Sequence, residues 1–557
     1  MKNLPIGISD FKEVIDDNYY YVDKTLLVKE IKEASAKILL FPRPRRFGKT
    51  LNMSMLKYFF EKTTVSNSYL FENTKIWQHK EYKELQGNYP VIYLTFKDTK
   101  ELTWQKAYER LVTIISAEFK YHYSFIKPEV LEPELIKYNT IRNRTAAETD
   151  YGDSLRMLSE LLFKSTGKRV IVLIDEYDVP IHSGYSNGYY KEVTSFIKSL
   201  LSGVLKDNEY LEKGILTGIL MIAKEGILTG LNNLKSYSLI SSKFDTQFGF
   251  TQAEVEKLLK DYDMLNMLDD VQSWYNGYKF GNNVIYNPWS MLNFLDEREL
   301  KPYWVNTSDN ELIKDLIAVF AVKSDFELLL SDQAIKKEID QFIIFPNLKD
   351  SSTSVWSLLL FTGYLTYTEC ELIEGVAYCN LVIPNKEIRF LYRDFLRYFF
   401  KASLGTTKIE LLLTAIKSGD ISTFGILLQE FVVNSMSMYD LPGNEPERSY
   451  HLFVLGLLVL LADEYQVKSN RESGYGRYDI MLIPKDRSKL GYVIEFKKVH
   501  SDKESLEESA QKAMEQIKAK CYAQELKDLG ITNILLLGIA FKGKQLLVLS
   551  ADSSYVE

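Results

Sequence analysis

One short stretch constrains the fold of this chain more than any other, because it joins an apolar run to a glycine, a lysine and a threonine. Residues 37–41 (KILLF) have the composition of a buried strand, and the turn PRPRRF and then Gly48, Lys49 and Thr50 follow. A helix that starts near Lys49 would aim free backbone N–H groups and its positive dipole end at an anion. The stretch therefore predicts a phosphate-binding loop in an α/β fold.

The loop departs from the usual pattern at one position. That pattern is G-x-x-x-x-G-K-[ST], and Arg43 stands where its first glycine belongs. Pro42 and Pro44 have restricted backbones and can stiffen the loop in its place. Arg45 and Arg46 would add positive charge near phosphates, although salt bridges to neighbouring carboxylates explain them equally well. The departure leaves the prediction of phosphate binding in place.

A second apolar run supplies the acidic residues that such a loop needs. Residues 170–175 (VIVLID) end at Asp175, whose carboxylate would lie at the carboxyl edge of the sheet, where ligands bind in open α/β sheets. We expect Asp175 to hold Mg²⁺ through water and Thr50 to contact the same ion through its hydroxyl. Glu176 would polarise the attacking water. The two stretches together predict ATP and Mg²⁺ as ligands.

Two further positions complete the predicted nucleotide site. Lys49 would reach the β- and γ-phosphates, and Thr217, on the apolar run at residues 214–220 (GILTGIL), would sense the γ-phosphate. The residues expected to contact the nucleotide are Arg45, Arg46, Phe47, Gly48, Lys49, Thr50, Asp175 and Thr217.

The pattern along the chain changes twice, which predicts three domains. Within residues 1–248, short apolar runs alternate with amphipathic segments, and this alternation indicates a parallel sheet covered by helices. Residues 249–404 show helical segments broken by aromatic turns, and we expect a helical lid or a winged-helix-like domain there. Strands return within residues 405–557 and predict a second α/β unit. The five N-terminal runs lie at residues 37–41, 91–96, 170–175, 214–220 and 237–240.

The composition limits which binding partners and which cellular compartment we expect for this protein. A net charge of -7 argues against a surface covered in basic residues, so any nucleic-acid site must be local. Cys370, Cys379 and Cys521 have no CxxC spacing, exclude a disulfide framework and a thiolate zinc site, and fit a reducing compartment. The first residues lack the apolar run of a signal peptide, and residues 452–462 (LFVLGLLVLLA) are too short for a membrane span and indicate a buried helix. We expect a cytoplasmic protein with no membrane segment.

The C-terminal strands carry a second constellation of charged residues. Asp479 lies in the run at 477–484, Glu495 and Lys497 lie in the run at 491–498, and the turn KDRSK separates them. A hairpin would bring the three side chains together, with Glu495 and Lys497 on one face. Two carboxylates can bind Mg²⁺ or Mn²⁺, which activates water and neutralises a phosphodiester, while the lysine stabilises charge. Cross-strand ion pairs have the same spacing, so spacing alone leaves both interpretations open.

Several motifs of the first two predicted domains resemble one family. The loop PRPRRFGKT with IDEYDVP, the opening LPIGISDFKEVI with YVDKT, and the later WYNGYKFGNNVIYNPWS look like the bacterial AAA-ATPase-like family, which is similar to archaeal-type ATPases with an R-R-x-G-K loop. Met221 departs from the family pattern, which leads us to expect an arginine there. If that arginine serves as a sensor or finger, hydrolysis is slow in this chain. The residues that the resemblance assigns to nucleotide and Mg²⁺ are Lys49, Thr50, Asp175 and Glu176.

The C-terminal part resembles the PD-(D/E)XK nuclease superfamily, which implies a restriction-endonuclease-like α/β fold. SNRESGYGRYDI and EFKK, within about residues 445–551, carry this resemblance. It implies that Asp479 and Glu495 ligate metal and that Lys497 assists the attacking water.

The same resemblance implies supporting residues around that site. Gln516 and Tyr522, on a predicted helix of about 25 residues, would line it. Glu447 is the candidate for an additional acidic residue, with His451 behind it. A solvated helix start for Glu447 and a packed or exposed histidine for His451 are the simpler explanations of these two.

The two constellations predict a two-part enzyme. An AAA-like ATPase module would be coupled through a lid to a metal-dependent nuclease, and ATP would gate the access of nucleic acid, with DNA the expected kind. An alternative is an ATP-dependent switch or scaffold whose nuclease-like domain binds nucleic acid or protein without cutting; the acidic charge and Met221 favour it. A third interpretation makes the C-terminal unit a structural or oligomerising domain. An arginine finger from a neighbour would imply a homo-oligomer, but no residue identifies itself as that finger.

Overall fold

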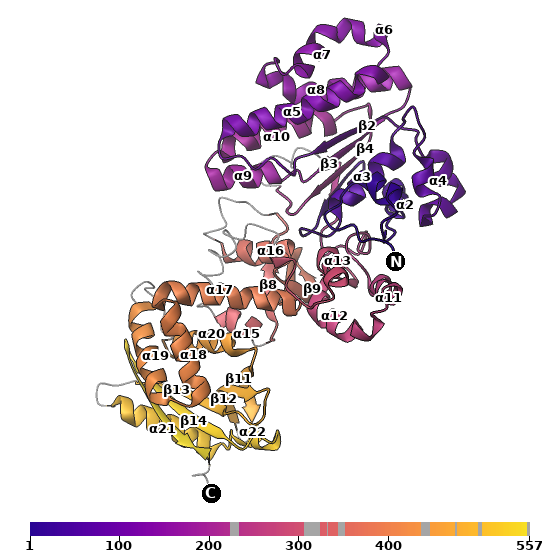
Figure 1. Cartoon of the computed structure of the whole chain (residues 1–557). Coiled ribbons are helices and arrows are strands. Elements are labelled where there is room, and N and C mark those ends of the chain that lie inside the picture. Colours follow the sequence, from indigo (N-terminus) through magenta and orange to yellow (C-terminus); the bar gives the residue numbers. More distant parts are fainter. Residues whose placement is uncertain are drawn as a thin grey trace. The chain divides into compact units, whose positions relative to one another are not determined.

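The computed structural model in Figure 1 describes most of the chain. The described residues are 1–222, 233–305, 324–330, 332–342, 351–435, 446–473, 476–499 and 504–553. Contacts divide the chain into two compact units: unit 1 comprises Met1–Thr307 and Lys336–Glu387, and unit 2 comprises Ser308–Ile335 and Ile388–Glu557. The domain boundaries expected after residues 248 and 404 stay predictions.

Unit 1 is built around a five-stranded parallel sheet with the order β2-β3-β4-β1-β5. All residues of β1 and β3 are buried, which is why these runs are apolar without alternation. The predicted α/β fold with a parallel sheet is thereby confirmed. The strands are β1 (Ile38–Pro42), β2 (Val91–Thr95), β3 (Val170–Asp175), β4 (Leu211–Gly218) and β5 (Leu234–Ser236).

Helices cover both faces of this sheet. Figure 1 shows α5, α8 and α10 on one face and α2 and α3 on the other. The helices of this part are α1 (Phe11–Asp16), α2 (Leu27–Glu33), α3 (Lys49–Phe60), α4 (Lys80–Leu85), α5 (Trp104–His122), α6 (Pro128–Leu131), α7 (Leu135–Arg142), α8 (Glu148–Thr166), α9 (Val179–Asn187) and α10 (Tyr190–Leu205).

The last strand of the sheet lies earlier than the sequence predicts. The prediction placed it at residues 237–240, whereas β5 ends at Ser236. Tyr237 still donates its N–H to the Leu40 carbonyl, but its ring packs against Phe244, with 4.6 Å between the ring centroids. Aromatic packing in a turn buries these apolar residues, so their composition misled the strand prediction.

The remaining part of unit 1 is helical, as expected, and also contains two small sheets. The hairpin of β6 (Tyr278–Phe280) and β7 (Asn283–Ile285) forms one, and the other has the order β8-β10-β9. A helix followed by a hairpin, as in α16, β9 and β10, is the arrangement expected of a winged-helix-like domain. The elements are α11 (Gln252–Asp261), α12 (Leu268–Tyr275), α13 (Pro288–Glu297), α16 (Ser352–Thr362), β8 (Ile335–Ile339), β9 (Thr366–Ile373) and β10 (Val376–Val382).

Two of the cysteines are bonded to each other. Cys370 on β9 and Cys379 on β10 are paired in the antiparallel register, and a disulfide joins them. The expectation that all three cysteines stay reduced is wrong at this pair, because the hairpin brings together two residues that the sequence separates by nine. Cys521 is free and exposed.

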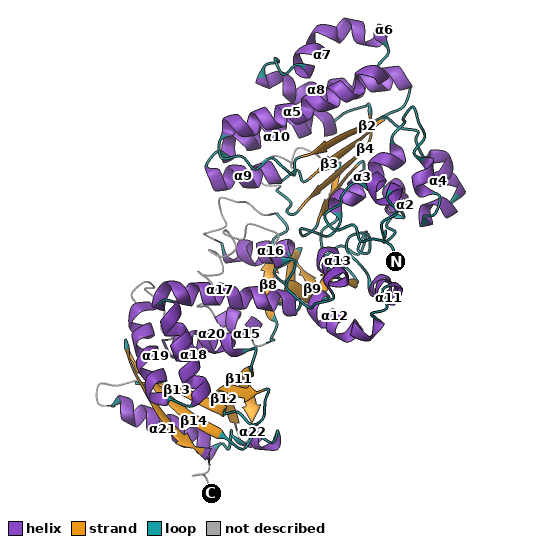
Figure 2. Ribbon diagram, viewed as in Figure 1, coloured by secondary structure: helices purple, strands orange, loops and turns teal. Residues whose placement is uncertain are grey.

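Unit 2 contains a mixed five-stranded sheet with the order β11-β12-β13-β14-β15, in which only β13 and β14 are parallel. Figure 2 shows the helices around this sheet. The strands are β11 (Tyr465–Ser473), β12 (Gly476–Pro484), β13 (Gly491–Lys498), β14 (Ile534–Lys542) and β15 (Gln545–Asp552). The helices are α15 (Ser324–Leu330), α17 (Lys386–Leu404), α18 (Thr406–Ser418), α19 (Ile421–Ser435), α20 (Pro446–Leu458), α21 (Leu506–Ala519) and α22 (Gln524–Asp528).

Two elements of unit 2 differ from the sequence prediction. The strand β11 was not predicted, because its polar sequence YQVKSNRES lacks a continuous apolar run. The helix of about 25 residues is instead two helices, α21 and α22, and Cys521 between them has φ = 52°. A residue in the left-handed region cannot continue a right-handed helix.

The most apolar stretch of the chain forms part of a buried helix, as predicted. It contributes to α20 and to the 3-10 turn Val459–Leu461, and Val454 and Leu455 are almost fully buried. Of the helices in the described part of the chain, none has the length and apolar character required to cross a membrane.

Candidate functional sites

The loop between β1 and α3 has the backbone that phosphate binding needs. Gly48 is the N-cap of α3 and has φ = 83°, a conformation that glycine adopts without strain. The first N–H groups of a helix lack partners within the helix and can therefore face an anion. The order of strand, turn and helix predicted from the sequence is present here.

Arg43 anchors the loop instead of facing the cavity. Its side chain is fully buried, and it donates to the carbonyls of Pro42 at 2.8 Å, Tyr237 at 2.6 Å and Phe244 at 3.3 Å. Its guanidinium also lies over the Phe248 ring. Burial lowers the pKa of Arg43 to about 9, so the side chain remains cationic at neutral pH. The departure from glycine thus ties the loop to the segment after β5.

Lys49 lies under the loop, where its ammonium donates hydrogen bonds to backbone carbonyls. It is 4% exposed, and its Nζ donates to the carbonyls of Arg43 at 3.1 Å and Pro44 at 3.0 Å. Burial lowers the pKa of Lys49, and the nearby Glu176 and Asp178 oppose that shift. A phosphate oxygen is a stronger acceptor than a carbonyl, so the ammonium is held ready to exchange partners.

Asp175 is the centre of a hydrogen-bonded cluster at the carboxyl edge of the sheet. Its Oδ2 accepts from the Thr50 hydroxyl at 2.8 Å and from Thr95 at 3.4 Å, and its Oδ1 accepts from Thr217 at 2.5 Å. Burial raises the pKa of Asp175, and the bond from Thr217 offsets part of that rise. These hydroxyl and carboxylate oxygens are the donor set that Mg²⁺ prefers, so the residues present fit this ion.

Glu176 lies beside this cluster. It has φ = 54°, and its N–H donates to the Thr217 hydroxyl at 3.3 Å. Its carboxylate, half-buried, lines the same cavity as Thr50 and makes no hydrogen bond or ion pair with any residue that the structure describes. It is therefore available to bind a water molecule, as the sequence predicts for a general base.

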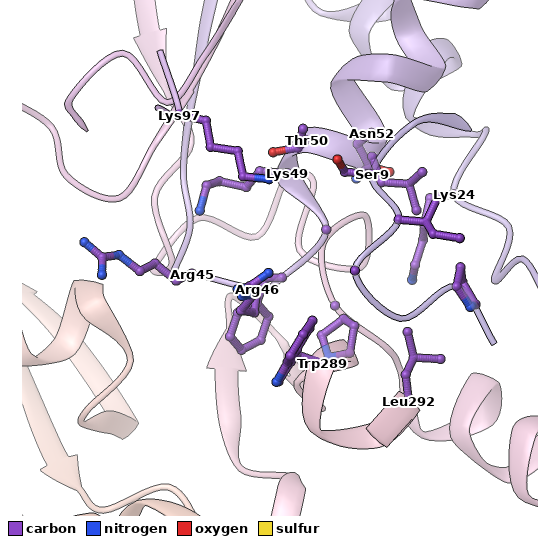
Figure 3. Close-up of a pocket in the computed structure, with 18 of the residues that line it drawn as sticks. Ser9, Lys24, Arg45, Arg46, Lys49, Thr50, Asn52, Lys97, Trp289 and Leu292 are labelled. Atoms are coloured by element: carbon purple, nitrogen blue, oxygen red, sulfur yellow. The ribbon is translucent and has the colours of Figure 1, made fainter. Parts of the chain in front are cut away.

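A cavity of about 300 Å³ opens over the loop and has two chemically different ends. Lys49, Thr50 and Glu176 lie at its polar end. Figure 3 shows Trp289 and Leu292 of α13 at the other end, and the lining also includes apolar residues of the N-terminal segment, such as Ile8 and Val22. The shape suits a ligand with a charged chain and a flat apolar group.

Figure 3 shows that Arg45 and Arg46, the two arginines of the loop that are not buried, differ in direction. The guanidinium of Arg46 lies 4.2 Å from the ring centroid of Trp289, at the apolar end. Arg45 extends away from Thr50 in this view. The Trp289 contact was not predicted, because it joins residues far apart in the chain and only the motif YNPWS pointed to this segment.

The loop is also tied to the start of α17 through a buried carboxylate. Trp304 donates its indole N–H to the Arg45 carbonyl at 3.1 Å and its backbone N–H to Glu387 at 2.6 Å. Glu387 is fully buried and also accepts from the Ser290 hydroxyl at 2.8 Å. Burial raises the pKa of Glu387 to about 7. α17 begins with the last two residues of unit 1 and continues in unit 2.

The C-terminal carboxylates meet as the sequence predicts. The hairpin of β12 and β13 brings Asp479 close to β13, where its Oδ2 accepts the Phe496 N–H at 2.8 Å. Glu495 and Lys497 form an ion pair, with 3.1 Å between Oε1 and Nζ. The three residues therefore lie together on two neighbouring strands of the sheet.

Glu495 has one oxygen without a partner. It is 2% exposed; Oε1 accepts from Lys497 and from Gln516, whereas Oε2 makes no hydrogen bond with any described residue. Burial and, secondarily, Asp479 raise the pKa of Glu495 to about 7, while Lys497 opposes the rise. A buried acceptor left unsatisfied is costly. A divalent cation between the two carboxylates would satisfy it, so the residues fit such an ion.

The residues predicted to support this site differ in how closely they contact the carboxylates. Gln516 contacts Glu495 and, at 3.3 Å, Tyr522, whose hydroxyl donates to the Arg477 carbonyl at 2.7 Å. His451 lies 3.1 Å from the Asp479 carbonyl oxygen through Nε2 and is buried, which agrees with a packed histidine. Glu447 falls on α20, but its side chain lies outside the described residues. In the described part of the chain, no group of three or more His, Cys, Asp and Glu side chains is arranged to hold a metal.

Comparison with known proteins agrees with this geometry. Residues 5–228 match the family described as predicted AAA-ATPase, and residues 445–550 match the PD-(D/E)XK nuclease superfamily. The chain pairs an AAA-ATPase-like domain with a PD-(D/E)XK domain. A protein of Azotobacter chroococcum mcd 1, described as an uncharacterized protein in the vnfD 5′ region, is 26% identical over 560 residues, which cover 97% of this chain and 96% of that relative.

The AAA-ATPase-like domain contains polar residues that sequence reasoning missed. Thr95 ends β2 and is paired in register with Asp175, so a polar residue at the end of that apolar run was the available signal. Met221, where the family resemblance leads us to expect an arginine, forms a bridge with Phe342. Residues 223–232, which follow this segment, lie outside the described residues.

Proposed function

We propose that the chain binds and hydrolyses ATP at the loop of its AAA-ATPase-like domain and cleaves nucleic acid at its PD-(D/E)XK domain, with ATP controlling the cleavage. The ATPase half rests on the joining of Thr50 to Asp175 beside Gly48 and Lys49. The nuclease half rests on the free Oε2 of Glu495. DNA as the substrate, a cytoplasmic location and assembly with further copies of the chain belong to the same proposal.

In the ATPase half, the phosphates would replace two backbone carbonyls as acceptors for Lys49. Mg²⁺, when bound beside Thr50 and Asp175, neutralises charge on the phosphates. Glu176 would accept a proton from water, and Thr217 would hold the Glu176 backbone in place while bonding Asp175. The apolar end of the cavity would receive the base.

In the nuclease half, Asp479 and Glu495 would hold Mg²⁺ or Mn²⁺, which supplies an activated water and stabilises charge on the phosphodiester. Lys497 would leave Glu495 and donate to the phosphate or the attacking water. Gln516, fixed by Tyr522, would keep Glu495 oriented. The ion pair and the glutamine together hold the carboxylate in one rotamer.

Control by ATP follows from the buried link between the loop and α17. Arg45, Trp304 and Glu387 are joined by hydrogen bonds, so a shift of the loop on phosphate binding would change the contacts of the first turn of α17. That helix leads into unit 2, which contains the PD-(D/E)XK domain.

A second function is favoured by Met221 and by the net charge of -7. With a neutral residue where an arginine is expected, the protein would bind ATP as a switch and hydrolyse it slowly. The PD-(D/E)XK domain would then bind nucleic acid or protein without cutting it.

The test is cleavage of labelled single- and double-stranded DNA and RNA with Mg²⁺ or Mn²⁺, with and without ATP. Wild type, Lys497→Ala and Lys49→Ala are compared. Cleavage that disappears with Lys497→Ala and changes its ATP response with Lys49→Ala supports the proposal. ATP binding without cleavage of any substrate supports the switch instead. If Lys49→Ala cuts as wild type does at every ATP concentration, ATP does not control the nuclease.

A further inference from the structure

Lys97 lies at the polar end of the cavity, although no motif points to it. It is the second residue after β2, whose last residue, Thr95, is paired in register with Asp175. Because the carboxyl ends of parallel strands share one edge of the sheet, this position brings Lys97 beside the nucleotide site. Lys97 lines the cavity together with Thr50 and Glu176, and Figure 3 shows its side chain directed over the loop.

The ammonium of Lys97 has no hydrogen-bond or ion-pair partner among the described residues, and the side chain is exposed. The neighbouring Asp98 is oriented toward Arg110, with 4.0 Å between the charged atoms. A lysine on a solvated surface has the same freedom, but here Lys97 shares the cavity with Glu176, the carboxylate assigned to the attacking water.

The other cations that line the cavity are engaged or directed elsewhere. Lys24 is paired with Glu254 at 2.6 Å, and Arg46 is stacked on Trp289. Arg45 extends away from Thr50 (Figure 3). Lys49 donates to two backbone carbonyls, and Lys100, also on the loop after β2, is left as the rival candidate.

Hydrolysis at this site calls for a positive group at the γ-phosphate. When the bond to the γ-phosphate breaks, charge accumulates on the oxygens at the scissile position, and a positioned cation stabilises it. A nucleoside diphosphate has no γ-phosphate. A cation that contacts the γ-phosphate therefore also makes the site bind the triphosphate more tightly than the diphosphate.

We propose that Lys97 binds the γ-phosphate of a nucleoside triphosphate and supplies positive charge there during hydrolysis. The inference rests on the proposed nucleotide site. It assigns Lys97 to discrimination between ATP and ADP and to stabilising charge during hydrolysis. Lys49 would serve the β- and γ-phosphates from beneath the loop, and Lys97 would approach the γ-phosphate from the β2 side.

The test measures the affinity of the full chain for ATP and for ADP by calorimetry with Mg²⁺. Because a charge-assisted hydrogen bond is lost, Lys97→Gln should weaken ATP binding about ten-fold and leave ADP binding within about two-fold. Lys97→Arg should restore most of the ATP affinity. Lys106→Gln, an exposed lysine on α5 that does not line the cavity, is the matched control and should bind both nucleotides as wild type does.

Two outcomes would overturn the inference and are distinguishable from each other. If Lys97→Gln binds ATP as wild type does, or loses ATP and ADP affinity equally, Lys97 does not contact the γ-phosphate while the nucleotide site itself stands. If wild type binds neither nucleotide, the proposed function of the loop fails and the role of Lys97 fails with it. A Lys100→Gln variant that alone shows the selective loss of ATP affinity would transfer the role to Lys100 and refute it for Lys97.

Discussion

Asp175 and Glu495 are both buried carboxylates on interior strands of a sheet, one in each unit, yet they are satisfied differently. Both oxygens of Asp175 accept hydrogen bonds from threonine hydroxyls. Glu495 shares Oε1 between Lys497 and Gln516 and leaves Oε2 without a partner among the described residues. The first carboxylate has both oxygens satisfied by the described residues, and an added cation would satisfy the second.

Because of this difference, the two sites gain binding energy from their ligands in different ways. At Asp175, a ligand must exchange with existing hydrogen bonds, so binding energy comes mainly from the loop and from Lys49. At Glu495, a cation would satisfy an acceptor whose burial is otherwise unfavourable. We therefore expect metal to stabilise unit 2 strongly, whereas Mg²⁺ without nucleotide should stabilise unit 1 little.

The largest effect should come from removing a carboxylate of the C-terminal pair. Glu495→Gln or Asp479→Asn should reduce Mn²⁺ affinity by more than the roughly 10–100-fold that loss of an outer-shell partner costs. Calorimetric titration with Mn²⁺ measures it, and Glu515→Gln, an exposed glutamate on α21, is the control. Unchanged Mn²⁺ affinity in both variants would show that the free oxygen of Glu495 is not a metal ligand.

The next largest effects should differ between Lys49 and Arg43, the two buried cations of the loop, in ATP affinity and in melting temperature. Lys49→Ala should weaken ATP binding about 10–100-fold and lower the melting temperature less than Arg43→Met does, because two carbonyls lose their donor instead of three. Arg43→Met should lower the melting temperature, since three carbonyls lose their donor. Scanning calorimetry and ATP titration of both variants check this contrast. Equal losses of stability would mean that Lys49 is as structural as Arg43.

A smaller effect should follow from Glu387, whose pKa burial raises to about 7. The folded chain holds this proton more tightly than the unfolded chain does. The contribution of Glu387 to stability is therefore fully present below its ordinary pKa and is lost as pH rises through about 7. Its size should be about 1–3 kcal/mol.

Glu387→Gln should flatten this part of the pH dependence. The measurement is the melting temperature between pH 5 and pH 8 in wild type and variant, with Glu371→Gln on the exposed part of β9 as the control. A variant with the same pH dependence as wild type would show that the buried carboxylate does not titrate in this range.

The same contrast shows what the sequence could predict. Asp175, Glu176, Asp479 and Glu495 follow from apolar runs and from spacing, because strand ends and hairpins fix where their residues lie. The partners that complete each site follow from tertiary packing. Trp304 and Glu387, for example, reach the loop from positions far along the chain.

Misplaced elements have equally local reasons. The apolar residues 237–240 are buried by ring packing, and the polar strand β11 gains its order from pairing with β12. Composition reports burial but not the kind of contact that produces it. The disulfide of Cys370 and Cys379 likewise depends on the register of a hairpin that the sequence reasoning did not predict.

The smallest expected effect is the difference in stability cost between two substitutions of threonines that donate to Asp175. Thr217→Val removes a donor at 2.5 Å and leaves a buried oxygen unsatisfied, which should cost about 1–3 kcal/mol of unfolding free energy. Thr95→Val removes a bond of 3.4 Å and leaves Oδ2 with Thr50, so it should cost less than about 1 kcal/mol. Because the Thr217 bond opposes the effect of burial, its loss should raise the pKa of Asp175 further.

Stability measured at pH 5 and pH 8 tests this order. A higher Asp175 pKa means that the ionised carboxylate is less stable in the folded protein, and this form is present at high pH. Thr217→Val should therefore lose more stability at pH 8 than at pH 5. Thr95→Val should lose about the same amount at both pH values. If Thr95→Val costs as much as Thr217→Val, the cluster is not organised around the short bond to Oδ1. The view that Asp175 is satisfied within the protein, unlike Glu495, would then lose its main support.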